Sequence, residues 1–310
     1  MAGRSGRLMT ESNHPEAPVA IFVYKRPLHT ARLLESLLRN DSASCSPIFV
    51  FCDGARAPGD DRAVAATRRV VRETLGTRCE LVERDRNWGL AASIIAGVTE
   101  LTALYGKVIV LEDDLVLHSG CLDFLNAALR RYENETRVWH VNAYRYPIPG
   151  AAAPSFSRLA SSWGWATWQR AWTGFEPDAE KLGRDIRAAG LASRMDFGGR
   201  FPYYEMLRNQ ARGRIDSWAI RWYASALIRG GLSLYPNASQ VINAGMDGTG
   251  AHCDSTSEYS VELGAASQDW PAQVAEDEAT YLQMRAYFGS VRGTVVRRMA
   301  RRLKRRLFTG

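Results

Sequence analysis

The chain has 310 residues, of which 46% are hydrophobic and 24% are charged, a composition typical of a globular protein and not of a disordered or fibrous one. Its formal net charge is +7, but eight basic residues and no acidic residue lie between Arg292 and Arg306. Subtracting those eight charges leaves −1 for the rest of the chain, so the charge predicts no nucleic-acid-binding surface on the folded body.

The first 17 residues are polar and contain no apolar core of a secretory signal, so residues 1–17 are expected to be a disordered N-terminus. No apolar run approaches the roughly 20 residues that a membrane-spanning helix needs. The cysteines are odd in number and have no paired spacing, which fits free thiols in a reducing compartment. We therefore expect a cytoplasmic protein.

The first 115 residues alternate strand and helix patterns, as is typical of a βαβ arrangement. Short apolar runs predict strands at Val19–Tyr24, Pro47–Cys52, Cys79–Glu83 and Lys107–Leu111. Amphipathic stretches predict helices at Leu28–Arg39, Asp60–Leu75 and Leu90–Leu104. Because the strands are continuously apolar, helices should cover both faces of a mostly parallel sheet. The sequence predicts an α/β fold.

Polar residues follow each of the four predicted strands, where parallel α/β sheets bind their ligands. They are Lys25-Arg26, Asp53-Gly54, Arg86-Asn87 and Glu112-Asp113-Asp114. Three adjacent carboxylates crowd like charges, and a divalent cation carrying a diphosphate is a natural counter-charge. If the strand continued through Asp114, Glu112 and Asp114 would point to one side and Asp113 to the other. The alternative is a solvated acidic turn in which Asp114 caps the next helix.

The pattern changes after Asp114, and a subdomain boundary is expected near residue 150. Further predicted elements are a helix at Cys121–Tyr132, a strand at Val138–Ala143, a helix at Ser217–Arg229 and a strand at Leu232–Tyr235. We expect residues 18–150 and residues 151–290 to form two halves of one domain. The family resemblance described next implies that the first is a nucleotide-sugar-binding half and the second the acceptor-binding half of the same catalytic domain.

Six segments together resemble the GT-A glycosyltransferases, in particular the N-acetylglucosaminyltransferase I group and related bacterial sugar transferases. They are Val23–Pro27, Phe51–Gly54, Asn87–Leu90, Glu112–Leu115, Trp163–Trp168 and Asn243–His252, in the order found in that family. The resemblance implies a GT-A type, Rossmann-like, mostly parallel sheet flanked by helices, with a C-terminal acceptor-side region. It also implies inverting transfer from a nucleotide sugar with Mn²⁺ (or Mg²⁺) as cofactor.

The resemblance assigns roles to residues that match the motifs of the family. Asp114 matches the acid that touches the metal, while Glu112 and Asp113 match residues that support the donor nucleotide and sugar. Nucleotide-sugar contacts are further implied for Arg26, Asp53, Asn87 and His252. Each of these four also has a structural interpretation: a surface cation, a turn-forming Asp, a helix-capping Asn and a structural histidine.

Inverting transfer needs a base that takes the proton of the attacking acceptor hydroxyl. The best match for the Asp that serves in the family is Asp216, although an Asp at this place is also a favoured helix cap. The animal enzyme has two adjacent acids where this chain has Asp216-Ser217, so the base could correspond to the position of Ser217. Asp247 is the fallback.

Trp163 and Trp165 are candidates for acceptor binding, because indole faces suit the apolar faces of sugars. The alternative is that the indoles form one face of a core helix, although Gly164 disfavours a regular helix there. The segment Gly245–Gly250 does not fit a phosphate-binding P-loop pattern. It is interpreted as a flap over the donor, with Gly248 and Gly250 as its flexible points.

Beyond Arg292, apolar residues recur at helical spacing among the basic ones and predict an amphipathic tail. We expect residues 292–306 to bind an anionic membrane surface, with a solvated end or nucleic-acid binding as alternatives. The partners would be a nucleotide-sugar donor, with UDP as the nucleotide, and a glycan or lipid-linked glycan acceptor. The location would be the cytoplasm, with peripheral attachment to the inner face of the cell membrane.

Two rival functions stay open at this point. One is a nucleotidyltransferase, against which Lys25-Arg26-Pro27 stands where a glycine-rich phosphate loop would be expected. The other is a non-catalytic glycan- or membrane-binding protein that retains the fold. The preferred hypothesis is a hexosyl- or N-acetylhexosaminyltransferase that acts in surface polysaccharide assembly.

Overall fold

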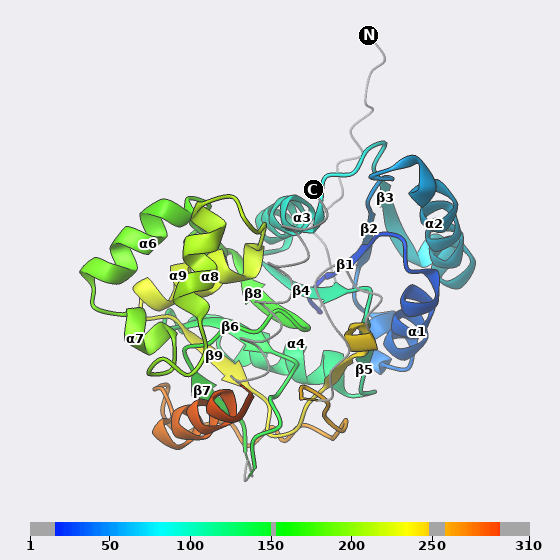
Figure 1. Cartoon of the computed structure of the whole chain (residues 1–310). Coiled ribbons are helices and arrows are strands. Elements are labelled where there is room, and N and C mark those ends of the chain that lie inside the picture. Colours follow the sequence, from blue (N-terminus) through cyan, green and yellow to red (C-terminus); the bar gives the residue numbers. More distant parts are fainter. Residues whose placement is uncertain (1–15, 150–152, 248–257, 292–310) are drawn as a thin grey trace.

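The computed structural model of the chain describes residues 16–149, 153–247 and 258–291 (Figure 1). One mixed sheet of eight strands runs through these residues in the order β3-β2-β1-β4-β8-β6-β9-β7. Its strands are β1 Val19–Val23, β2 Ile48–Cys52, β3 Cys79–Glu83, β4 Lys107–Glu112, β6 Val138–Asn142, β7 Ser155–Ser157, β8 Trp165–Trp168 and β9 Leu232–Tyr235. A second small sheet pairs β5 Leu115–Leu117 with β10 Val241–Asn243.

Helices cover both faces of this sheet. They are α1 Pro27–Leu38, α2 Asp61–Leu75, α3 Leu90–Tyr105, α4 Cys121–Arg131, α5 Gln169–Trp172, α6 Ala179–Ala188, α7 Ala192–Met195, α8 Tyr203–Ala211 and α9 Trp218–Ile228. A further helix occupies residues 278–291. Four 3₁₀ turns also occur in the described ranges: η1 Asp41–Ser44, η2 Pro58–Asp60, η3 Gly76–Arg78 and η4 Ala244–Asp247.

The α/β prediction is confirmed. Strands β3, β2, β1 and β4 are mutually parallel, and each lies within one residue of its predicted bounds. Their carboxyl ends therefore meet at one edge of the sheet, where the polar residues expected from the sequence gather.

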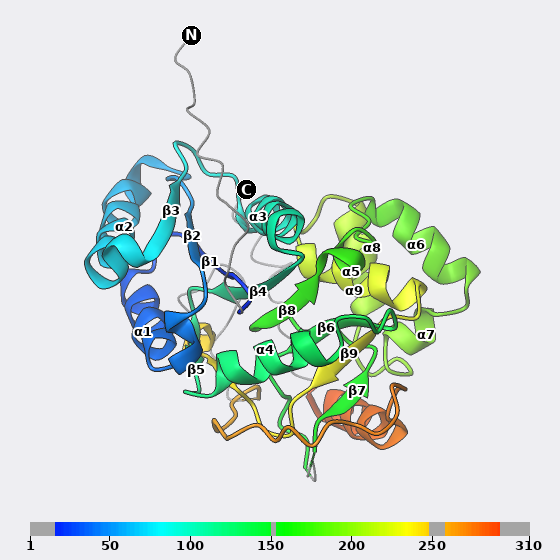
Figure 2. The same ribbon diagram turned by 180° about the vertical axis from the view of Figure 1, so that it is seen from behind.

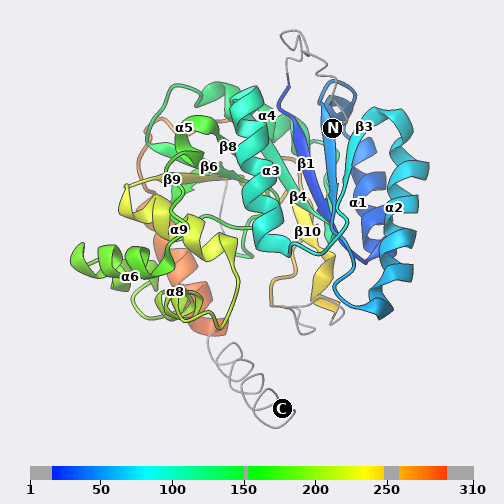
Figure 3. The ribbon, with the colours of Figure 1, turned by 90° about the horizontal axis from the view of Figure 1, so that it is seen from above.

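Alternation of side chains along the strands explains the two layers of the core. In β1, Val19 and Ile21 pack on the face covered by α1, α2 and α4, while Phe22 packs on the opposite face against α3. Figure 3 shows α3 on one side of β1 and both α1 and α2 on the other, and Figure 2 shows α3 and α4 on opposite sides of β4 and β8. Both faces of β1 and β2 are buried, which is why these two strands are apolar at every position, whereas the edge strand β3 is only partly buried and carries Glu80 and Glu83.

The C-terminal half differs from the prediction in its details. The indole-rich segment is not a helix: Trp165–Trp168 form β8, which pairs antiparallel with both β4 and β6. Gly164 has φ of +67°, a conformation that suits glycine, and β8 begins at the next residue, Trp165. Strands β5, β7 and β10 and helices α5–α8 were not predicted.

The short sheet formed by β5 and β10 joins distant parts of the chain. Strand β5 begins directly after Asp114, and β10 pairs with it so that Asn243 lies opposite Leu115. Asn243, the first residue of the sixth family-like segment, thereby lies next to the acidic turn.

No helix in the described part of the chain is both long and apolar enough to cross a membrane. The cysteines in this part, Cys45, Cys52, Cys79 and Cys121, are free thiols. The basic tail at 292–310, most of the expected N-terminal segment and Cys253 lie outside the described residues. The division into halves at residue 150 stays a prediction.

Candidate active site

The acidic turn lies between β4 and β5, at the carboxyl edge of the parallel strands. Glu112 is the last residue of β4 and is paired with Phe22 of β1. Arg26, which precedes α1, reaches across from the end of β1. Its Nη1 lies 3.0 Å from Oδ2 of Asp114 and 3.6 Å from Oδ1 of Asp113. The structure thus brings together two of the strand ends that the sequence singled out.

Burial and like charge act together on these carboxyl groups. Burial, followed by the nearby Asp114 and Asp113 carboxylates, raises the pKa of Glu112 well above its usual value. Burial and then Asp114 raise the pKa of Asp113 to about 7, against the opposing effect of the Arg26 cation. The side chains of Asp113 and Asp114 keep exposed fractions of only 14% and 17%. Positive charge brought to this turn would stabilise its ionised form.

The segment after β10 closes one side of the turn. The backbone N–H of Ala244 donates to the carbonyl oxygen of Asp114 at 2.7 Å. A Cβ atom at Gly245 would lie 2.1 Å from Oδ2 of Asp114, closer than any real contact, so this position accepts only glycine unless the carboxylate moves. Of the proposed flap, Gly248, Gly250 and the candidate His252 lie outside the described residues.

Asp53 and Asn87 organise the loop between β3 and α3. The buried Asp53 carboxylate accepts three backbone N–H groups: Gly54 at 3.0 Å, Trp88 at 2.8 Å and Gly89 at 2.9 Å. The side-chain amide of Asn87 donates to the carbonyl oxygen of Gly54 at 2.9 Å. Both residues therefore tie the end of β2 to the entrance of α3, whether or not they also contact a nucleotide.

A cavity of about 400 Å³ lies beside the ends of β2 and β3, next to α2. Gly54, Arg68 and Arg84 are among the residues that line it. The guanidinium of Arg84 stacks on the ring of Trp88, with its Cζ 3.5 Å from the ring centroid, so the β3–α3 loop also borders this space.

The two candidate acceptor-binding indoles lie in different environments. Trp165 is fully buried, with its ring stacked on His140 and on Trp218, so the expectation that it contacts an acceptor is corrected: it is a core residue. Trp163 precedes β8, packs edge-on against Tyr144 and Tyr259, and is only partly buried. Because Trp165 pairs with Val110, the register places Trp163 near the end of β4, beside the acidic turn.

Asp216 precedes α9, but the helix cap is its neighbour. The Ser217 hydroxyl accepts the backbone N–H of Ile220 at 3.3 Å, so the capping role weighed for Asp216 belongs to Ser217. The Asp216 side chain is 67% exposed, and its Oδ1 accepts a hydrogen bond from Nη2 of Arg221 at 3.1 Å. Asp216 is accessible to a substrate, and its role as a base stays a prediction. The backbone of the fallback, Asp247, ends η4.

Two side chains near Arg26, Tyr24 and Asp60, were not among the site residues predicted from the sequence. The Tyr24 hydroxyl donates to Oδ2 of Asp60 at 2.6 Å, and Nζ of Lys25 lies 2.6 Å from Oδ1 of the same carboxylate. The Pro58-Gly59-Asp60 sequence indicated only a turn that leads into α2. Nothing in that local pattern indicated a contact across 36 residues with the end of β1.

The residues of the turn fit a divalent cation in their chemistry. The acidic turn offers carboxylate oxygens, which hard cations prefer, and Asp114 is partly exposed. Among the described residues, no group of three or more His, Cys, Asp or Glu side chains is arranged to hold a metal by itself. The donor set therefore fits a cation that takes one or two protein carboxylates and completes its shell with substrate phosphate and water.

No protein-family model and no curated protein sequence matches the chain. Among solved structures, the chain is similar to the mannosyltransferase PcManGT from Pyrobaculum calidifontis in complex with GDP-Man and Mn²⁺. The two chains share 15% identity with a TM-score of 0.37, and the match covers 70% of this chain and 76% of that one. GalNAc-T7 with UDP, GalNAc and Mn²⁺ gives 9% identity, a TM-score of 0.36, and coverage of 53% and 37%. The apo form of mouse xyloside xylosyltransferase 1 gives 12% identity, a TM-score of 0.34, and coverage of 68% and 81%.

All three are glycosyltransferases by name. Because their TM-scores lie below 0.5, we base the functional argument on the residues at the sheet edge.

Proposed function

We propose that the chain is a metal-dependent, inverting glycosyltransferase that moves a sugar from a nucleotide-diphosphate donor, with UDP as the nucleotide, to a hydroxyl of a glycan. The observation that carries this proposal is the acidic turn at the end of β4, which Arg26 and the segment at Gly245 approach from two sides. Carboxylates and a guanidinium side by side suit a ligand that combines a divalent cation with phosphates.

Each residue has a distinct task in this proposal. Asp114 would hold the divalent cation, which when bound acts as a Lewis acid on the leaving diphosphate. Arg26 contacts the acidic turn, and its guanidinium would also bind phosphate oxygens of the donor. Glu112 and Asp113 would support the donor nucleotide and sugar. Asp53 and Asn87 hold the loop between β3 and α3, which would border the donor.

The acceptor side depends on Asp216 and Trp163. The exposed Asp216 carboxylate would take the proton of the attacking hydroxyl, and Nη2 of Arg221 lies 3.1 Å from its Oδ1. The partly exposed Trp163 would offer its ring to the acceptor sugar. Residue His252 would lie near the donor diphosphate, as the family resemblance implies.

The test is a screen of nucleotide sugars for release of nucleotide, with and without Mn²⁺. We expect release from one donor only in the presence of the metal, and a decrease of about 100-fold or more in Asp114→Asn with the protein still folded. Asp185→Asn on the exposed surface of α6 is the matched control and should keep the wild-type rate. An Asp114→Asn variant with normal turnover and normal Mn²⁺ dependence would contradict the proposal.

A second variant separates donor binding from transfer. Asp216→Asn should bind UDP and Mn²⁺ as the wild type does in calorimetry but should lose sugar transfer. If transfer survives, the base lies elsewhere. Binding of UDP by the wild type without turnover of any donor would favour a non-catalytic binding protein.

The proposal extends to a membrane-bound setting in surface polysaccharide assembly, with a lipid-linked glycan as acceptor. A groove of about 380 Å³ on the helix at 278–291 is lined by Arg200, Arg285 and the half-exposed Leu282. Neither arginine forms an ion pair with an acid in the described part of the chain, and this helix leads into the basic segment 292–306. Both features suit an anionic lipid surface.

Deleting residues 292–310 should move the protein from the membrane fraction to the soluble fraction without changing donor hydrolysis. Unchanged fractionation would show that the tail is not the anchor.

A further inference from the structure

The turn after β1 is held from two sides by side chains that come from different strand ends. Tyr24, Lys25 and Arg26 are consecutive in this turn. The carboxylate of Asp60, at the start of α2, accepts the Tyr24 hydroxyl at 2.6 Å and pairs with Nζ of Lys25 at 2.6 Å. The Tyr24 oxygen in turn accepts the backbone N–H of Arg56 at 3.0 Å. These contacts attach the β2–α2 loop to the end of β1.

The other side of the same turn contacts the acidic residues. Nη1 of Arg26 lies 3.0 Å from Oδ2 of Asp114 and 3.6 Å from Oδ1 of Asp113. The turn therefore contacts Asp60 on one side and the acidic residues on the other, and the residue two positions after Tyr24 carries the guanidinium at the candidate donor site. A displacement of Tyr24 would move the backbone from which Arg26 extends.

The ionisation states of the contacting groups make these contacts persistent. Hydrogen bonds from Lys25 and then Tyr24 lower the pKa of Asp60 to about 2, so its carboxylate is charged across the physiological range. Burial, followed by the hydrogen bond to Asp60, raises the pKa of Tyr24 to about 12, so the phenol keeps the proton that it donates. A charge-assisted O–H to carboxylate bond is stronger than a neutral one.

We propose that Asp60 is a positioning residue of the donor site. Asp60 fixes the turn formed by Tyr24, Lys25 and Arg26, so that the Arg26 guanidinium meets the diphosphate of a bound nucleotide beside the acidic turn. This inference rests on the proposed function for the identity of the ligand. The contacts that define the positioning role belong to the protein alone and can be measured without a substrate.

The experiment compares Asp60→Asn and Tyr24→Phe with Glu73→Gln, which makes the same change of charge on α2 at a side chain that is 68% exposed and does not line the cavity beside that helix. Binding of UDP is measured by calorimetry with and without Mn²⁺, and the donor KM and kcat are measured separately. We expect Asp60→Asn to weaken UDP binding and to raise the donor KM by about tenfold to a hundredfold, with a smaller change of kcat. Glu73→Gln should match the wild type.

Amide hydrogen exchange supplies a readout that needs no ligand. The Arg56 amide, which donates to the Tyr24 hydroxyl, should exchange faster in Tyr24→Phe and in Asp60→Asn but not in Glu73→Gln. Because Tyr24→Phe and Asp60→Asn break one shared contact, the double variant should lose less UDP affinity than the sum of the two single losses.

The outcomes separate this inference from the proposed function. If the wild type binds UDP but Asp60→Asn binds it equally well, Asp60 is not a positioning residue, although the donor site stands. An equal loss in Glu73→Gln would show a general effect of charge and would also overturn the inference. If the wild type does not bind UDP, the proposed function fails. Exchange at Arg56 that is unchanged in both variants would then show that the contact itself is absent.

Discussion

The two halves of the sheet use their polar side chains in different ways. In the parallel half, formed by β3, β2, β1 and β4, the strands β1 and β2 are apolar throughout, and polar residues stand at the carboxyl edge. In the mixed half, formed by β8, β6, β9 and β7, polar groups such as His140 and Asn142 are buried within the strands. The first arrangement brings charged side chains together at the edge of the sheet, whereas the second joins His140 and Asn142 by a hydrogen bond inside the core.

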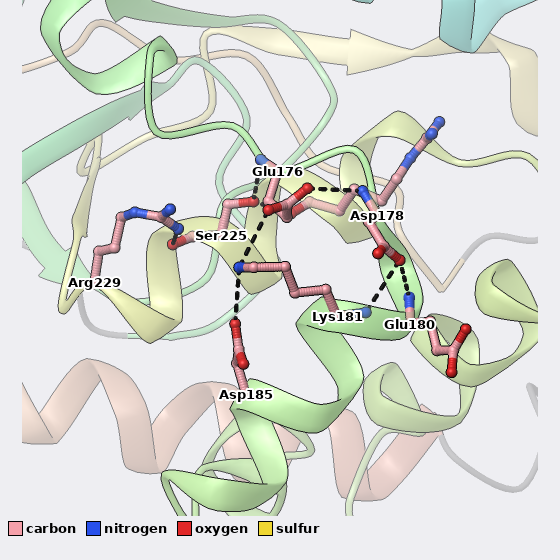
Figure 4. A network of polar contacts seen from close by, with 8 residues as sticks. Glu176, Asp178, Glu180, Lys181, Asp185, Ser225 and Arg229 are labelled. Atoms are coloured by element: carbon pink, nitrogen blue, oxygen red, sulfur yellow. Dashed lines mark hydrogen bonds and ion pairs between the residues drawn. The ribbon is translucent and has the colours of Figure 1, made fainter.

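The surface of the mixed half shows the same internal use of charge. Lys181 on α6 pairs with Glu176 at 3.2 Å and with Asp185 at 3.1 Å, and Asp178 caps α6 by accepting the N–H groups of Glu180 and Lys181 (Figure 4). The Glu176 backbone N–H donates to Ser225 of α9 at 3.0 Å. Every member of this network has a partner of opposite charge or a hydrogen bond, so its charges are neutralised within the protein.

The largest expected effect tests whether Trp165 belongs to the core. Trp165→Ala should lower the free energy of unfolding by about 3–5 kcal/mol, because it removes a fully buried indole that stacks on His140 and Trp218. Trp163→Ala, which removes a partly buried ring, should cost clearly less and should raise the acceptor KM. Urea unfolding compares the two, and an equal cost would place both indoles in the core.

A second prediction concerns the contact between Gly245 and the acidic turn. Gly245→Ala should reduce turnover by about 100-fold, because the added Cβ displaces the Asp114 carboxylate. Gly183→Ala on α6 is the matched control, since its Cβ would meet nothing within 4 Å, and it should keep full activity. Nucleotide release by both variants is the measurement. Normal turnover in Gly245→Ala would show that the position of Asp114 does not matter for the reaction.

The parallel half could be predicted from the sequence because its physics is local. A strand buried on both faces must be apolar at each position, so β1, β2 and β4 appear as short continuous apolar runs. The mixed half was predicted less well. The indoles of β8 repeat at spacings that a helix also allows, and only pairing with β4 and β6 decides between the two.

The candidate site, too, could be predicted from the sequence only in part. That polar groups gather at the carboxyl edge followed from strand order, but which of them touch did not. The assumption that the strand continues through Asp114 was wrong: β4 ends at Glu112, and the turn that follows lets Arg26 reach both Asp113 and Asp114. The contacts of Asp60 with Tyr24 and of Gly245 with Asp114 depend on tertiary packing, and no local pattern encodes them.

A third prediction concerns the buried histidine of β6. Burial lowers the pKa of His140 to about 3, and its ring lies between neutral partners, with Trp222 at 3.1 Å and Asn142 at 3.0 Å. Between pH 6.5 and 3 the unfolded chain binds a proton at this residue that the folded protein does not. The free energy of unfolding should therefore decrease by about 1.4 kcal/mol per pH unit below pH 6.5 from this group alone.

The matched variant for this group is His140→Gln, which keeps a donor and an acceptor but does not titrate. Urea unfolding at pH 7.5, 6.5 and 5.5 should show a steeper decrease for the wild type than for the variant. Equal slopes would mean that His140 is protonated in the folded protein as easily as in the unfolded chain.

The smallest expected effect comes from the surface network of Figure 4. Lys181→Ala removes ion pairs with Glu176 and Asp185, but the lysine side chain is 46% exposed, and water solvates both carboxylates once it is gone. The midpoint of thermal unfolding should change by no more than about 1 °C.

Asp178→Ala, which leaves two N–H groups at the start of α6 without their acceptor, should lower the midpoint of thermal unfolding by more than Lys181→Ala does. The reverse order would mean that the ion pairs, and not the helix cap, hold α6 in place. Neither change should alter UDP binding, because these charges are neutralised within their own half of the molecule.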